Sequence, residues 1–263
     1  MKRISLTALI LLFTVLVASG QVQRQFTDRI FHSSLDQDLP YKVRFQENCD
    51  PAQSYPLLLF LHGSGERGTD NNAQLLHGGD RLQSDPALKG TIVIVPQCPK
   101  EDSWVRLAQA DNSSGQRERN FPYSAPISSS MKAVKELLDA FIAIGIVDTE
   151  QVFGMGISMG GMGILDLTFR YPDLFAAVQP LCGGANNDRA SEFKGKTSFR
   201  FFHGLRDAVV LPKYSQENCE ALKEAGINAT IVEYPEDTHN CWDNTFREPD
   251  LFTWMFKQAE SGK

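Results

Sequence analysis

Ser158 lies in the stretch GMGISMGGMG, residues 154–163, where five of ten residues are glycine. A serine hydroxyl attacks a carbonyl carbon when a neighbouring base takes its proton. The pattern Gly-x-Ser-x-Gly is typical of a serine held on a sharp turn between a strand and a helix. Gly156 and Gly160 would leave the space in which a Cβ would clash. We therefore predict a nucleophile at Ser158, with the alternative that these glycines only let a strand and a helix pack closely.

The base and the acid of such a site follow the serine along the chain, in the order serine, acid, histidine. His239 lies in PEDTHNCWD, just beyond the apolar run ATIVEY, and is the expected base. His203, at the end of SFRFF, is expected to have a structural role. Asp207, in FFHGLRDAVV, is the expected acid that orients the histidine, with Asp188 as the alternative. Asp207 could also be an N-cap of the segment that follows it.

Two backbone amides are needed to hold the oxyanion that forms when a serine attacks a carbonyl group. The Met159 amide, directly after the serine, is the first expected donor. The second should come from the loop HGSGERG, residues 62–68, which follows the apolar run LLLFL. We expect the Ser64 amide to be this donor, with Gly65 as the alternative. His62 is expected to brace the loop through hydrogen bonds.

Two tryptophans are candidates for substrate binding. Trp242 lies three residues beyond His239, and Trp104 follows PQCPKEDS behind the apolar run TIVIV. In parallel sheets, ligands bind near the carboxyl ends of strands. The alternative for each tryptophan is packing in the core or under a lid.

The elements that must position these residues form an alternating series after residue 55. Short apolar runs alternate with helical patterns, which predicts a mostly parallel sheet covered by helices on both faces, an α/β fold. Apolar residues trace one helical face over 127–142, and a last helix is expected at 249–258. Residues 26–32 and 41–46 alternate in polarity and are expected to form antiparallel strands at one edge. Segment 97–126 is long, polar and without clear periodicity.

Residues 1–20 have the composition of an export signal. Lys2 and Arg3 precede an apolar run over 4–17, and Ala18-Ser19-Gly20 offers small residues for cleavage. A membrane anchor is the alternative, although the run is short for a span. We therefore expect a signal peptide at 1–20, a single catalytic domain at 21–263 and a secreted or periplasmic protein without stable membrane insertion.

The charge and the cysteines exclude several classes of protein. The net charge of −6 falls to −8 when Lys2 and Arg3 are removed, which argues against binding to nucleic acid. No Cys-x-x-Cys spacing suggests zinc, and no metal or other cofactor is expected. At most two disulfides can form among the five cysteines, and their pairing is open: Cys49, Cys98, Cys182, Cys219 and Cys241.

The phrases LHGSGERG, VPQCP, GISMGGMG, HGLRD and THNCWD together resemble the α/β-hydrolase superfamily over roughly residues 40–260. Within it the chain is most similar to secreted feruloyl and acetylxylan esterases of carbohydrate esterase family one, which include proteins labelled as peptidases or phospholipase/carboxylesterases. Cys241 departs from the small residue expected there. The resemblance implies an α/β-hydrolase fold with Ser158 as nucleophile, His239 as base, Asp207 as acid, and Ser64 and Met159 as oxyanion donors.

The expected activity is hydrolysis of a feruloyl or acetyl ester of a plant-type polysaccharide or oligosaccharide through an acyl-enzyme. One alternative is a small serine peptidase or an acyltransferase that uses the same three residues. Another is a hydrolase fold that has lost catalysis and serves as a binding module.

Overall fold

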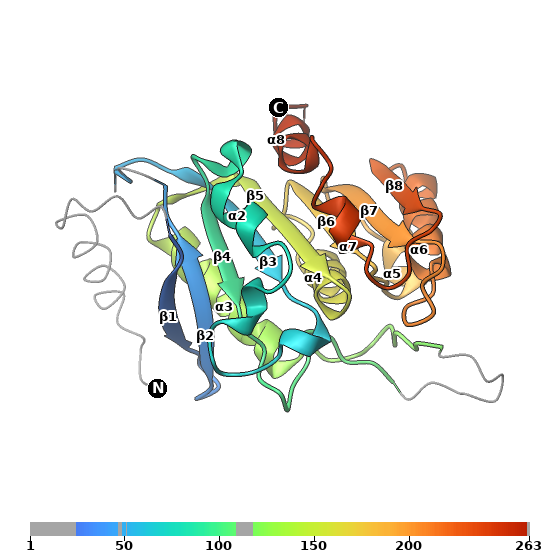
Figure 1. Cartoon of the computed structure of the whole chain (residues 1–263), viewed down its shortest axis with the longest axis horizontal. Helices are drawn as coiled ribbons and strands as arrows, with labels where there is room; N and C mark the ends of the chain where they lie inside the picture. The colour runs from blue at the N-terminus through green and yellow to red at the C-terminus, as the bar shows by residue number, and fades with distance from the viewer. Residues whose placement is uncertain (1–24, 47–48, 51, 109–117, 262–263) are drawn as a thin grey trace.

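The fold is that of a computed structural model that describes residues 25–46, 49–50, 52–108 and 118–261 (Figure 1). The expected signal peptide at 1–20 lies outside these residues. Within the described chain, eight strands form one sheet in the order β1-β2-β4-β3-β5-β6-β7-β8. Their bounds are β1 Thr27–His32, β2 Asp38–Arg44, β3 Tyr55–Leu61, β4 Ile92–Pro96, β5 Val147–Ile157, β6 Ala177–Leu181, β7 Ser198–Gly204 and β8 Ala229–Tyr234.

Strands β3 to β8 pair in parallel, whereas β1 and β2 are antiparallel and extend one edge. Both features confirm the sequence-based prediction. The helices α2 to α6 lie between strands along the chain, and α7 and α8 follow β8. Their bounds are α2 Gly79–Ser84, α3 Ser129–Ala143, α4 Met159–Arg170, α5 Asn187–Ser191, α6 Lys213–Glu224, α7 Trp242–Thr245 and α8 Leu251–Ser261, with short 3-10 turns η1 Ser64–Glu66, η2 Ala73–Leu75 and η3 Pro86–Leu88. The last helix therefore begins two residues later than expected.

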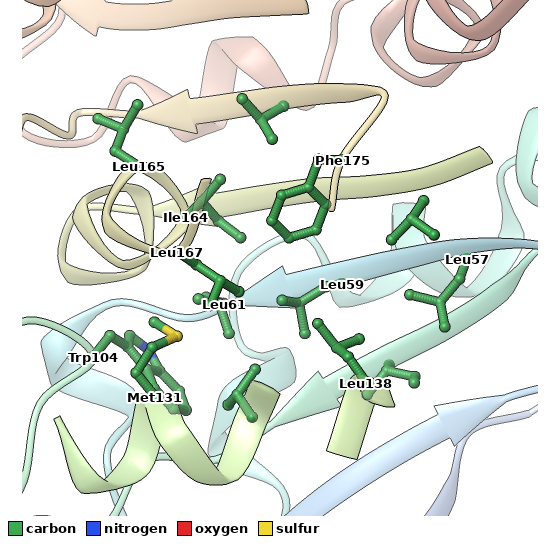
Figure 2. Packing of buried hydrophobic residues seen from close by; sticks show 14 of the residues in the cluster. Leu57, Leu59, Leu61, Trp104, Met131, Leu138, Ile164, Leu165, Leu167 and Phe175 are labelled. Atoms are coloured by element: carbon green, nitrogen blue, oxygen red, sulfur yellow. The ribbon is translucent and has the colours of Figure 1, made fainter. Parts of the chain in front are cut away.

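The two faces of the sheet support two hydrophobic clusters. In β3, Leu57, Leu59 and Leu61 face one cluster while Leu58 and Phe60 face the other, because successive side chains of a strand point to opposite sides. Helices α3, α4 and α6 cover the first face, and α2 and α8 cover the second. Figure 2 shows the first cluster, with α4 residues above the leucines of β3. The central strands are thus buried on both sides, and their carboxyl ends are held rigidly.

None of the helices in the described residues is both long and apolar enough to cross a bilayer.

Candidate active site

Ser158 lies on the turn between β5 and α4 with φ 52° and ψ −112°. Non-glycine residues rarely adopt a positive φ. The turn is held by the Ser158 amide, which donates to the Leu181 carbonyl of β6 at 2.7 Å. A Cβ at Gly160 would lie 2.0 Å from the Leu61 carbonyl oxygen, and one at Gly156 would lie 2.4 Å from the Gly160 backbone. The glycines therefore allow three backbone segments to meet around the serine.

Ser158, His239 and Asp207 form a continuous hydrogen-bonded chain. The Ser158 Oγ lies 2.8 Å from His239 Nε2, and His239 Nδ1 lies 2.6 Å from Asp207 Oδ2. A carboxylate only accepts hydrogen bonds, so Nδ1 carries the proton and Nε2 is left to accept the serine proton. This is the tautomer that a general base requires. Asp188, the alternative acid, lies on α5 and is exposed.

The carboxylate of Asp207 is fixed from several directions. Its Oδ1 accepts from the amides of Val209 at 2.8 Å and Val210 at 2.9 Å, as an N-cap residue would. Burial would raise the pKa of Asp207, but hydrogen bonds from His203 and His239 outweigh burial. The Val210 amide adds to their effect and the pKa is held well below its usual range. Asp207 therefore stays ionised beside the histidine.

His203 is wholly buried and structural. Its Nε2 donates to the Val210 carbonyl at 2.9 Å and also lies 3.4 Å from Asp207 Oδ2, and its Nδ1 lies 2.7 Å from Ser215 Oγ. Cys182, His203 and Asp207 bring potential metal-ligand atoms within 4.8 Å of one another. Both ring nitrogens of His203 already have hydrogen-bond partners, and both carboxylate oxygens of Asp207 accept hydrogen bonds. The sulfur of Cys182 is bonded to Cys241. The cluster is therefore better described as a buried hydrogen-bonded network than as a metal site.

The two expected oxyanion donors, Ser64 and Met159, line the same pocket as Ser158. Met159 is the first residue of α4 and Ser64 the first of η1, and the first amides of a helix have no acceptor within it. Both residues line a pocket of about 130 Å³ together with Ser158. Gly65, the alternative donor, is the next residue of η1. His62 braces the loop: its Nδ1 donates to the Gly63 carbonyl at 2.6 Å, and its Nε2 accepts the Cys98 amide at 3.0 Å.

The far wall of this pocket combines apolar and cationic side chains. Arg67 is held by the carbonyl oxygens of Ser64, Lys100 and Asp102, at 3.0, 3.1 and 3.2 Å. Arg119 donates to the Val209 carbonyl at 3.4 Å. Arg67 belongs to the HGSGERG loop that the sequence already placed beside the serine, whereas Arg119 gave no recognisable signal, because it comes from a segment far from both in the chain. The apolar part of the wall consists of Val105, Leu107 and Met162.

Trp104 does not reach the pocket, and the expectation that it binds substrate is wrong for this structure. Its side chain is 0% exposed, and its indole N–H donates to the His62 carbonyl at 3.1 Å. Figure 2 shows Trp104 beside Met131 in the first hydrophobic cluster. A buried indole has no face to offer a ligand. The alternative from the sequence, packing in the core, describes this residue.

Trp242, in contrast, lies beside the expected base, His239. Its ring is 5.5 Å from that of His239 in an edge-on arrangement, and 5.1 Å from that of His77. Trp242 and His77 also line an open groove of about 570 Å³ that shares no lining residue with the pocket at Ser158. Sequence spacing suggested Trp242, but nothing in the sequence placed His77 next to it.

A disulfide links the loop that carries His239 to the end of β6. Cys182, directly after β6, is bonded to Cys241, two residues beyond His239. The remaining cysteines, Cys49, Cys98 and Cys219, are free. The residue that departs from the expected pattern, Cys241, thus has a structural partner.

A parallel sheet with a strained serine after β5, followed by an acid after β7 and a histidine after β8, defines an α/β-hydrolase. Residues 45–253 match the model of the phospholipase/carboxylesterase family, and the chain belongs to that family. This family places it among the carboxylesterase-type serine hydrolases.

Individual relatives have similar descriptions. A probable carboxylesterase of Oryza sativa subsp. japonica is 25% identical over 208 residues, which cover 73% of this chain and 84% of the relative. Carboxylesterase SOBER1 of Arabidopsis thaliana is 32% identical over 133 residues, 47% of this chain and 58% of the relative.

Solved structures share the fold. A thermostable esterase has a TM-score of 0.75 at 27% identity, and the match covers 90% of this chain but 64% of the esterase. A ferulic acid esterase has a TM-score of 0.63 at 16% identity, covering 90% of this chain and 98% of that one. At 16% identity the second likeness concerns the fold alone.

Proposed function

We propose that Ser158 attacks the carbonyl carbon of an ester while His239 takes its proton. The oxyanion then lies against the amides of Ser64 and Met159, and Asp207 stabilises the imidazolium. His239 returns the proton to the departing alcohol, and water hydrolyses the acyl-enzyme in the same way. The hydrogen-bonded chain from Asp207 to Ser158, beside a pocket flanked by two helix N-termini, is the observation that carries this proposal.

The acyl group that we propose is feruloyl or acetyl. The pocket of about 130 Å³ is close in size to an apolar cavity of roughly 150 Å³ that binds benzene, so it has room for an aromatic ring. Met162 offers a sulfur to such a ring, and the guanidinium groups of Arg67 and Arg119 are donors for phenolic or methoxy oxygens. These features support a feruloyl group over the smaller acetyl group.

We further propose a plant-type polysaccharide or oligosaccharide as the alcohol, and a secreted or periplasmic location. The export pattern of residues 1–20 motivates the location. The Cys182–Cys241 disulfide supports it, because disulfides persist in oxidising compartments.

The test of the proposed function compares kcat/KM for methyl ferulate, an acetylated xylo-oligosaccharide, a short p-nitrophenyl ester and a chromogenic dipeptide. We expect the esters to be hydrolysed, and Ser158→Ala to remain folded with almost no turnover. A fluorophosphonate probe should label the wild type and not the variant. Preference for the dipeptide would favour a peptidase, and a folded wild type that neither reacts with the probe nor hydrolyses any substrate would indicate a binding module.

A further inference from the structure

The open groove beside Trp242 lies one ring away from His239, because Trp242 lines the groove and packs edge-on against His239. The rings of His239, Trp242 and His77 form a continuous row, with centroid distances of 5.5 and 5.1 Å between neighbours. The groove lies along the Trp242 and His77 end of this row. Trp242 therefore connects His239 to the groove.

The direction of the reaction decides which part of an ester enters it. During acylation the carbonyl oxygen lies against the amides of Ser64 and Met159, so the acyl group occupies the pocket on their side. His239 must donate its proton to the departing oxygen, so the alcohol lies on the side of the histidine. Because Trp242 of the groove packs against His239, and the groove has no lining residue in common with the acyl pocket, we assign the groove to the alcohol.

The chemistry of the groove fits a neutral alcohol with many hydroxyl groups. Asp243 and Arg247 are both exposed and carry opposite charges, and His77 adds a ring nitrogen. The second arginine of the lining, Arg81, is paired with Asp85. A hydroxyl group both donates and accepts, so it can bind an acceptor and a donor at one site. Trp242 and Leu76, which is 71% exposed, supply apolar surface for the carbon faces of a ring. A groove lined by one sign of charge would instead select an ion.

The size of the groove shows how large an alcohol it can hold. Its volume of about 570 Å³ is within the range of small-molecule sites, roughly 300–1,000 Å³. A cavity of about 150 Å³ holds one six-membered ring, so this groove has room for more than one. We propose that it is the leaving-group subsite for an alcohol of at least two sugar units. This inference rests on the proposed esterase function and deepens it.

The floor of the groove is already formed without a ligand. Gly78 has φ 76°, and a Cβ there would lie 2.0 Å from the Phe246 ring, so the backbone rests directly on that ring. Arg81 donates to the Phe246 carbonyl and pairs with Asp85 at 2.7 Å. The Nε2 of His77 lies 3.6 Å from the buried carboxylate of Glu66. A fixed surface of this kind binds without a large ordering cost.

The test uses two esters that share one acyl group, methyl ferulate and a feruloylated xylo-oligosaccharide. Both give the same acyl-enzyme, so a difference in kcat/KM reports acylation and leaving-group binding. We expect His77→Ala and Asp243→Ala to lower kcat/KM for the oligosaccharide ester by about tenfold, the effect of losing one good polar contact. The value for methyl ferulate should change by less than about twofold. His32→Ala and Asp139→Ala are matched controls at exposed positions outside the groove and should alter neither value.

A second measurement does not depend on turnover. Xylotriose should bind to Ser158→Ala in calorimetry, and adding His77→Ala should weaken that binding by a similar factor. Equal losses of kcat/KM for both esters in His77→Ala and Asp243→Ala would overturn the proposed subsite. So would the absence of xylotriose binding, or xylotriose binding that His77→Ala does not weaken. Failure of the wild type to hydrolyse methyl ferulate would instead contradict the proposed function, and the binding experiment would still decide whether the groove holds a sugar.

Discussion

At the scale of single residues, Asp207 fixes the orientation and tautomer of His239, and thereby the ring nitrogen that faces Ser158. Its Oδ1 accepts two backbone amides, which leaves Oδ2 as the oxygen that faces His239. Asparagine in this place would keep its oxygen on the amides and turn its NH₂ group towards the imidazole. The imidazole would then carry its proton on Nε2 and could not accept from Ser158.

We therefore expect Asp207→Asn to lower kcat by up to about 10⁴ while the fold is retained, as the same change does in a serine protease. Steady-state kinetics beside circular dichroism measures this. Asp188→Asn is the matched control and should be nearly silent, since Asp188 is exposed on α5. The reverse result would mean that the acid has been assigned to the wrong strand.

The lowered pKa of Asp207 also makes stability depend on pH. A carboxyl group has a pKa near 3.9 in an unfolded chain, so below about pH 4 the unfolded state takes up a proton that the folded state does not. The contribution of Asp207 is complete above that value and is lost as the pH falls towards the folded pKa. Urea unfolding should therefore show that the difference in free energy of unfolding between wild type and Asp207→Asn narrows as the pH falls from about 5 to 3. A difference that grows with acid would contradict the assigned shift.

The sequence indicated the position of all of these residues, but the side-chain direction of only some of them. Ser158, His239 and Asp207 could be proposed because each follows an apolar strand in a fixed order. Trp104 follows a strand too, but its indole turns inward to the His62 carbonyl. Spacing along the chain gives the place of a side chain at the sheet and not its direction, which depends on packing between distant segments.

At the scale of elements, the turn from β5 into α4 depends on close backbone contact. The missing side chain of Gly160 lets α4 start directly against the end of β3. In the sequence, this close contact was recognisable as a cluster of glycines, and the strands were recognisable as apolar runs. The sequence did not indicate the strand order, in which β4 lies between β2 and β3, because pairing is decided by contacts between residues far apart in the chain.

We expect Gly160→Ala to lower the free energy of unfolding by about 1–3 kcal/mol or more, since a methyl group there overlaps backbone atoms that cannot rotate away. Urea unfolding followed by fluorescence measures this. Gly65→Ala is the matched control: its Cβ would meet nothing within 4 Å, so stability should change by less than about 0.5 kcal/mol. Equal stability of the two variants would show that the turn relaxes easily.

At the scale of the whole molecule, one covalent bond joins the site to the sheet. The Cys182–Cys241 disulfide spans a sequence separation of 59 residues and holds the loop of His239 against the end of β6. A bond that closes a loop of this length stabilises the fold by about 4 kcal/mol in the chain-entropy model. The sequence left the pairing open, because five cysteines without a diagnostic spacing fit many arrangements.

Thiol titration of the denatured, unreduced protein should therefore find three free thiols, and five after reduction. Reductant should also lower the free energy of unfolding, and Cys241→Ser should reproduce that loss and make stability insensitive to reductant. Cys219→Ser is the control, because Cys219 is a buried free thiol outside the bridge, and it should leave the response to reductant intact. Five reactive thiols before reduction, in protein from an oxidising compartment, would show that the bond does not form and that the His239 loop is held by packing alone.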